Sequence, residues 1–328
     1  MSLGNDTQKR PFRVVVVGAG VAGLVLSNAL QRAGIDHVVL EKHKEIVWPS
    51  GASIGIWPNG ARLLDQLGCL DAVQNACADM TASYTRGPDG KAVTVSQLFD
   101  EITESKSPIK TGCAVTGILE SEDGVRVSLA DGSHEDGDMV IGCDGVASRV
   151  RQIMWYNANK AIPNTITDGE MKCGMCAIES AASLVNHVRA KLISSPLGLS
   201  SHPSQQELAP VFQAYRDERI SRVSQIFRLS SIMTREQAWD NLFYKGVAKY
   251  VFPYMSDATV ASVFSGVVKG AVKLDFVPLS NKFEGTVPWE DRSGKVVAMN
   301  KSTGAMLAFG AALLIYAAYL YRGIGGHY

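Results

Sequence analysis

Three glycines near the beginning of the chain have the spacing of a phosphate-binding turn. Gly18, Gly20 and Gly23 form the pattern G-x-G-x-x-G directly after a run of valines. The first glycine permits a tight turn, the second lets backbone approach a pyrophosphate, and the third lets the following helix pack closely. Phosphate oxygens then meet free N–H groups at the helix N-terminus. The pattern predicts a site for the ADP half of a dinucleotide.

An acidic residue stands where the ribose of such a ligand would be recognised. Glu41 follows Gly23 by 18 residues, and its carboxylate would accept hydrogen bonds from the ribose hydroxyls. Because a carboxylate repels a 2′-phosphate, this residue argues against NADP at the site and leaves FAD or NAD. The alternative interpretation is a glycine turn in an unrelated α/β sheet.

The elements that must position these residues follow from the hydrophobic pattern. Residues 13–17 are a continuous apolar run, typical of a strand buried on both faces of a parallel sheet. Apolar residues at helical spacing predict a helix over 24–33 that stops at Gly34, and a second strand follows over 37–40. Strand, helix and strand in about thirty residues make one βαβ crossover unit.

The rest of the chain alternates between helical and strand patterns, with no internal repeat. We expect a helix over 56–73, a hairpin of strands 114–120 and 125–129, a strand over 139–141, helices over 175–192 and 205–231, and an apolar, irregular stretch over 246–277.

A second motif favours FAD over NAD. Residues 142–151 read G-C-D-G-V-A-S-R-V-R. This decamer resembles G-A-D-G-x-x-S-x-V-R of the group A flavoprotein monooxygenases, the aromatic-hydroxylase-like family. Residues 34–42, 51–56 and 58–60 look like those of the fungal membrane-associated FAD-dependent monooxygenases and epoxidases of meroterpenoid and indole-diterpene biosynthesis. The resemblance implies FAD as the cofactor, with Asp144 and Gly145 near the flavin pyrophosphate.

The resemblance also implies a fold and an activity. The fold would be α/β, with a Rossmann-like FAD-binding domain of the GR2 flavoprotein type, a truncated substrate region and a helical C-terminal part. Gly55 and Gly174 join the cofactor-binding residues. NADPH would reduce the flavin, O₂ would add at C4a to give a hydroperoxide, and one oxygen atom would pass to an apolar terpenoid-type small molecule of secondary metabolism. We expect no protein nucleophile, since the cofactor carries this chemistry.

The chain departs from the family pattern in its middle. A central region, where the family places the sheet that covers the substrate, is missing near Trp155. The aspartate that contacts the flavin in the family falls on Tyr156, and only Gly174 remains for the backbone contact of the flavin loop. An alternative function is therefore an inactive, shortened homologue that retains partial nucleotide binding. A nicotinamide dehydrogenase is a further option, but it leaves the Asp144 motif unexplained.

Composition argues against several other classes of protein. Lys plus Arg and Asp plus Glu number 32 each, so the net charge of zero gives no basis for nucleic-acid binding. The six cysteines are spread thinly and suggest reduced thiols. Cys173 and Cys176 form a C-x-x-C pair, but with no second pair or histidine cluster we predict no metal site.

The C-terminal segment 302–321 contains no charged residue and has about the twenty residues that a bilayer-spanning helix needs. Flanking Lys301 and Arg322 and several tyrosines favour a membrane helix over a buried C-terminal helix. We expect a single-pass C-terminal anchor with the catalytic part facing the cytosol. The predicted organisation is a disordered tail (1–11), an FAD-binding domain with a reduced substrate sheet (12–192), a helical region (193–280), a linker (281–301) and the transmembrane helix (302–321).

Overall fold

The computed structural model describes residues 10–46, 56–75, 83–86, 92–96, 108–121, 124–145, 147–161, 177–251 and 268–280. The chain divides into two compact units. The first consists of residues 1–76, 102–220 and 272–283, and the second of residues 77–101, 221–271 and 284–328. The boundary predicted at residue 192 stays a prediction. The candidate site lies entirely in the first unit.

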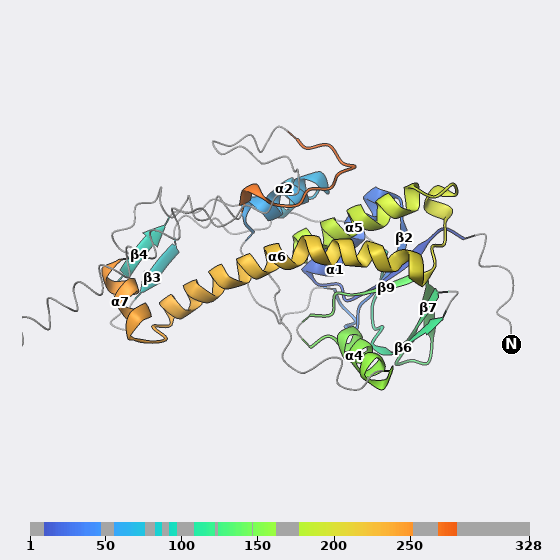
Figure 1. The fold of residues 1–328 in the computed structure, drawn as a ribbon, viewed down its shortest axis with the longest axis horizontal. Helices are drawn as coiled ribbons and strands as arrows, with labels where there is room; N and C mark the ends of the chain where they lie inside the picture. The colour runs from blue at the N-terminus through green and yellow to red at the C-terminus, as the bar shows by residue number, and fades with distance from the viewer. Residues whose placement is uncertain are drawn as a thin grey trace, which may run out of the picture. The chain divides into compact units, whose positions relative to one another are not determined.

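A four-stranded parallel sheet forms the centre of the first unit (Figure 1). Its strand order is β5 (Ile109–Lys110), β2 (Asp36–Leu40), β1 (Arg13–Val17) and β9 (Met139–Gly142). The last four residues of β1 and of β2 are buried, as expected for strands covered on both faces. The predicted strands at 13–17, 37–40 and 139–141 are therefore confirmed.

Helices cover one face of this sheet and enclose the larger hydrophobic core. Helix α1 (Val21–Ala33) connects β1 to β2 and packs against α5 (Ala177–Ile193) (Figure 1). Leu26, Leu30 and Val185 are at most 1% exposed in this core. Helix α1 ends at Gly34, which adopts a left-handed conformation with φ of 73°, so the predicted stop is confirmed. The helix begins three residues earlier than expected.

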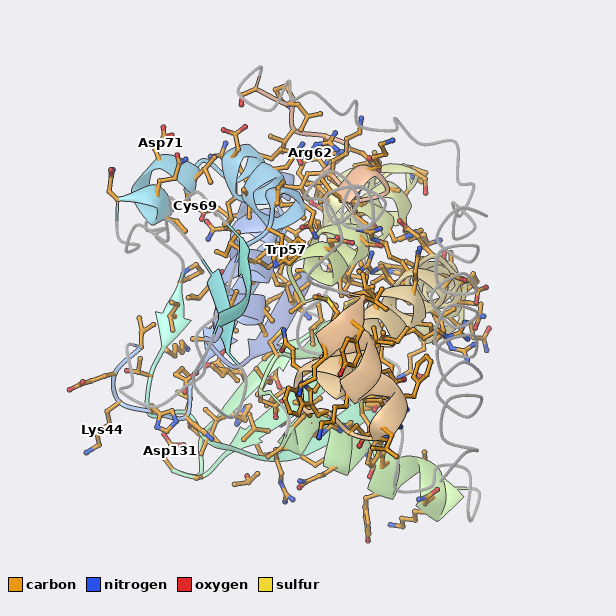
Figure 2. All side chains as sticks on the ribbon, turned by 90° about the vertical axis from the view of Figure 1, so that its left-hand side faces the viewer. Lys44, Trp57, Arg62, Cys69, Asp71 and Asp131 are labelled. Carbon is orange, nitrogen blue, oxygen red and sulfur yellow. The ribbon has the colours of Figure 1, made fainter. Side chains whose placement is uncertain are left out.

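The helix predicted over 56–73 is two helices. Helix α2 (Pro58–Gln66) and helix α3 (Leu70–Gln74) are separated by Gly68, whose φ is 71°. A positive φ ends the helical hydrogen-bond ladder at little cost in a residue without Cβ. Figure 2 labels Arg62 within α2, and Cys69 and Asp71 at the start of α3. The apolar spacing continues through the break, which is why the sequence pattern did not reveal it.

The other face of the central sheet packs on a small antiparallel sheet. Strands β6 (Val115–Ser121), β7 (Gly124–Leu129) and β8 (His134–Gly137) form it in that order. Its apolar face joins Val15 and Leu40 of the central sheet in a second core. The predicted hairpin is confirmed, whereas β8 was not predicted. Helix α4 (Arg149–Ala161) follows β9 and contacts β6.

The remaining described elements include a long helix that extends from one unit into the other. Helix α6 (Gln205–Gln237) begins in the first unit, and its second half belongs to the other. The second unit also contains α7 (Leu242–Tyr250), β3 (Ser83–Arg86) and β4 (Ala92–Ser96). Because α7 is a regular helix, the prediction of an irregular stretch over 246–277 is wrong for residues 246–250. A short 3₁₀ turn, η2 (Gly198–Ser200), precedes α6.

The predicted tail over 1–11 and the predicted anchor over 302–321 stay predictions. Arg10, inside the predicted disordered tail, forms an ion pair of 2.7 Å with Asp138 and is thus held in place. The linker 281–301 and the membrane segment 302–321 lie outside the described residues. Within the described part of the chain, no helix combines the length and the apolar character needed to cross a bilayer.

Candidate functional site

The turn after β1 is shaped by Gly18. The Gly18 N–H donates to the Leu40 carbonyl at 2.8 Å, and the φ of Gly18 is +104°, a conformation that L side chains rarely adopt. A Cβ at this position would lie 2.6 Å from the carbonyl oxygen of Cys143. The first glycine of the motif is therefore required by backbone conformation and by the close approach of the chain after β9.

The other two glycines of the motif have opposite surroundings. A Cβ on Gly23 would lie 1.9 Å from the Gly18 carbonyl oxygen, so this glycine is required by packing. A Cβ on Gly20 would meet no atom within 4 Å, and Gly20 precedes α1 without a side-chain cap on the first turn. Because packing does not require a glycine at position 20, the open space there matches the predicted approach of a pyrophosphate to the start of α1.

Glu41 stabilises the glycine turn from the end of β2. Its side chain accepts hydrogen bonds from the Ala19 N–H at 2.7 Å and the His43 N–H at 3.0 Å, one at each oxygen. The residue is 8% exposed. Since each carboxylate oxygen can accept more than one hydrogen bond, both retain capacity for a ribose hydroxyl.

The second motif follows β9 at the same edge of the sheet. The Cys143 N–H donates to the Val17 carbonyl at 2.7 Å, which joins this segment to the end of β1. One oxygen of Asp144 accepts from the backbone N–H groups of Arg149 and Val150 and so caps α4. The other, Oδ1, is buried and makes no hydrogen bond within the described residues. A buried polar oxygen without a partner is costly, which marks Asp144 as a point where a ligand donor fits.

The topology brings the two motifs together. Strands β2, β1 and β9 are adjacent and parallel, so their carboxyl ends lie at the same edge of the sheet. From β1 the chain continues to β2 on one side, and β9 lies on the other side of β1. Such a switch point is the usual ligand site of an open α/β sheet. The predicted cofactor-binding residues at this edge are Gly18, Gly20, Gly23, Glu41, Asp144 and Gly145. Gly55 and Gly174 lie outside the described residues, and the binding roles of all eight stay predictions.

Two features of the first unit were not predicted from the sequence. Burial raises the pKa of the Cys143 thiol to about 12, which makes this residue a packing group rather than a nucleophile. A buried ion pair joins Glu179 of α5 to Arg219 of α6. The sequence pattern predicted a helix here but not which of its charged residues is buried. No group of three or more His, Cys, Asp or Glu residues within the described ranges has the arrangement of a metal site.

The donors and acceptors at this edge fit FAD. Helix α1 offers its N-terminus to phosphates, Glu41 offers acceptors to a ribose, and Asp144 Oδ1 offers a buried acceptor. Tyr156, at the position where the resemblance leads us to expect an aspartate, is 68% exposed on α4. The described residues therefore match the ADP portion of FAD more completely than the flavin portion.

Known proteins share this region of the chain. Residues 12–89 match the FAD binding domain family. The FAD-dependent monooxygenase DEP2 of Fusarium langsethiae is 38% identical over 218 residues, which cover 58% of this chain and 40% of that protein. The FAD-dependent monooxygenase atmM of Aspergillus flavus is 39% identical over 186 residues, covering 50% of this chain and 39% of that protein.

The matches cover only part of each known protein. The chain spans about 40% of the length of the curated relatives it matches. Among solved structures, 2,6-dihydroxypyridine-3-hydroxylase from Arthrobacter nicotinovorans overlaps 44% of this chain and 40% of its own, with 22% identity and a TM-score of 0.36. The resemblance inferred from the two motifs is confirmed by the curated sequences. The chain is thus similar, over half of its length or slightly more, to fungal FAD-dependent monooxygenases, and its residues 12–89 match the FAD binding domain family.

Proposed function

We propose that the protein binds FAD at the switch point of the parallel sheet and acts as a monooxygenase on an apolar, terpenoid-type small molecule of secondary metabolism, with NADPH as the reductant. The observation that carries the proposal is the contrast among the three glycines. Gly18 and Gly23 are required by the backbone around them, whereas Gly20 faces open space at the start of a helix. A ligand that approaches the backbone explains why position 20 has no side chain.

Each residue of the site then has a role that its surroundings support. The N-terminus of α1 would bind the pyrophosphate through backbone N–H groups. Glu41 would bind the ribose hydroxyls while holding the Ala19 amide. Asp144 Oδ1 would accept a hydrogen bond from the ligand while Oδ2 continues to cap α4. Bound FAD would supply the redox and oxygen chemistry, and the protein would orient the substrate and exclude water.

FAD binding is the first test of this function. The protein is purified in detergent, reconstituted with FAD, and titrated by quenching of flavin fluorescence, with the visible spectrum recorded after removal of free FAD. We expect stoichiometric bound flavin, and weaker binding by at least about tenfold in the Asp144→Asn variant, which replaces the charged acceptor. Asp131→Asn is the matched control, because Asp131 lies in the exposed turn after β7. A chain without bound flavin would contradict the proposal.

Turnover and membrane attachment are tested separately. NADPH oxidation that accelerates with an apolar terpenoid, with an oxygenated product detected by mass spectrometry, supports monooxygenation. Nucleotide binding without substrate-stimulated NADPH oxidation or product supports the second candidate, an inactive, shortened homologue that retains partial nucleotide binding. That candidate is favoured by Tyr156, an exposed residue in place of the family's aspartate. Attachment through residues 302–321 predicts release from membranes by detergent and not by high salt.

A further inference from the structure

We propose that residues 272–280 form a strap whose attachment to α2 and α5 controls the affinity of the FAD site, with Gln66 and Asn186 as the positioning residues that hold it. The inference rests on the proposed function and adds regulation to the same site. The strap follows both nucleotide motifs by a long stretch of sequence, yet it returns to the first unit and lies beside α2 (Figure 1).

Two side-chain amides hold the same peptide bond of the strap. Asn186 of α5 donates from Nδ2 to the Lys273 carbonyl at 2.7 Å. The Leu274 N–H donates to Oε1 of Gln66, in α2, at 2.8 Å. The carbonyl and the N–H of the Lys273–Leu274 peptide bond are therefore both bound, one by α5 and the other by α2.

Each amide makes further contacts along the strap. Gln66 is 2% exposed, and its Nε2 also donates to the carbonyls of Leu274 at 2.9 Å and Val277 at 2.7 Å. Asn186 Oδ1 accepts from the Asp275 N–H at 3.1 Å. Residues 272–280 belong to neither a helix nor a strand. Because buried backbone groups outside regular structure need other partners, the two amides take the place of a neighbouring strand.

The apolar residues of the strap complete the core around α1. Val272 and Leu274 are each 1% exposed, and they belong to the same hydrophobic cluster as Leu26 and Leu30 of α1. Protein interiors are closely packed, so release of the strap would leave a space in this core. The start of α1 is the proposed pyrophosphate site. The position of the strap and the affinity for the ligand are therefore coupled through one packed core.

The outer part of the strap is held by contacts nearer to solvent. Ser280 Oγ donates to Asp65 Oδ2 at 2.5 Å on the exposed surface, and the guanidinium carbon of Arg189 lies 4.7 Å from the centre of the Phe276 ring. A segment held by side chains can open without unfolding of the sheet. Opening would free the Lys273–Leu274 peptide bond, which trypsin cleaves.

Coupling between the strap and the ligand must act in both directions. If attachment raises the affinity for FAD by a given factor, bound FAD lowers the opening of the strap by the same factor. ADP should have the same kind of effect, since it also places a pyrophosphate at the start of α1. A strap that served only the stability of the fold would lack this reciprocal effect.

The experiment measures trypsin cleavage after Lys273 in the full chain by mass spectrometry, with and without saturating FAD or ADP. Cleavage after Arg62, which is 2% exposed within α2, reports unfolding of the unit itself. Gln66→Met and Asn186→Leu remove the amides and keep much of the side-chain volume. Gln31→Met is the matched control at an exposed position of α1. The FAD affinity of each variant is measured by fluorescence titration.

We expect cleavage after Lys273 to precede cleavage after Arg62, and FAD or ADP to slow it by at least about fivefold. Gln66→Met and Asn186→Leu should each accelerate this cleavage and weaken FAD binding by at least about fivefold, whereas Gln31→Met should change neither.

Three results would each overturn the inference: cleavage after Lys273 that is no faster than after Arg62, cleavage that bound FAD does not slow, or faster cleavage in the variants with wild-type FAD affinity. If the variants do not fold, the two wild-type measurements decide. A wild-type chain in which ADP slows the cleavage but FAD does not bind would overturn the proposed function and would still support the coupling.

Discussion

Substitution of Gly20 by alanine tests whether glycine is needed at this position for ligand binding or for the stability of the fold. Gly20 has φ of −72° and ψ of −179°, values that alanine adopts without strain, and an added Cβ would meet no atom within 4 Å. A compatible Gly→Ala change stabilises a protein by about 0.4–1 kcal/mol, because the unfolded chain loses conformational freedom. We therefore expect Gly20→Ala to be at least as stable as the wild type.

The same methyl group would enter the space assigned to the pyrophosphate. We expect Gly20→Ala to weaken FAD binding by at least about tenfold, which corresponds to about 1.4 kcal/mol. Gly23→Ala is the matched comparison, because its Cβ would lie 1.9 Å from the Gly18 carbonyl oxygen and would displace backbone. Overpacking of this kind typically costs about 1–3 kcal/mol of stability, so this variant should lose stability as well as affinity.

The assay combines urea unfolding with fluorescence titrations of FAD and ADP. Gly20→Ala should retain or raise the unfolding free energy and lose affinity for both ligands, since both carry the pyrophosphate. If Gly20→Ala binds FAD as tightly as the wild type, the open space at position 20 is not where the phosphates bind. If it is instead as unstable as Gly23→Ala, the space around Gly20 is not open in solution.

Three other predictions concern side chains of the same unit. Glu41→Ala should cost about 1–3 kcal/mol in urea unfolding, because the buried Ala19 N–H loses its acceptor, and an unchanged unfolding free energy would refute this role. Burial lowers the pKa of His37 below 6.5, and its ring nitrogens contact the Ser27 hydroxyl and the Ile35 carbonyl, an arrangement that suits the neutral ring. Its contribution to stability is therefore present above pH 6.5 and declines as the pH falls toward the folded pKa, so unfolding at pH 7.5 and 5.5 should differ less in His37→Asn than in the wild type. Because the pKa of Cys143 is raised to about 12, this thiol should react with iodoacetamide at pH 8 only after unfolding, and its modification in the native protein, detected by mass spectrometry, would contradict the assigned burial.

The sequence by itself determined the parts of the site that are built from neighbouring residues. The valine run of β1, the glycine turn, the stop of α1 at Gly34 and the position of Glu41 at the end of β2 all follow from patterns a few residues long. Backbone conformation and hydrophobic period are local properties, so short patterns report them. The decamer after β9 indicated FAD in the same way, through its likeness to a known motif.

Only the tertiary structure decided which distant residues meet. The hydrogen bond from the Cys143 N–H to the Val17 carbonyl depends on strand order, which no local pattern encodes. The separation of α2 from α3 and the burial of Arg219 against Glu179 likewise depend on how helices pack. From the sequence alone, a charged residue on a helix is expected to be exposed to solvent. Only the structure shows whether a carboxylate lies close enough for the charge to be buried. For this reason the sequence predicted the ADP end of the site, whereas the buried ion pair of Arg219 with Glu179 was found only in the fold.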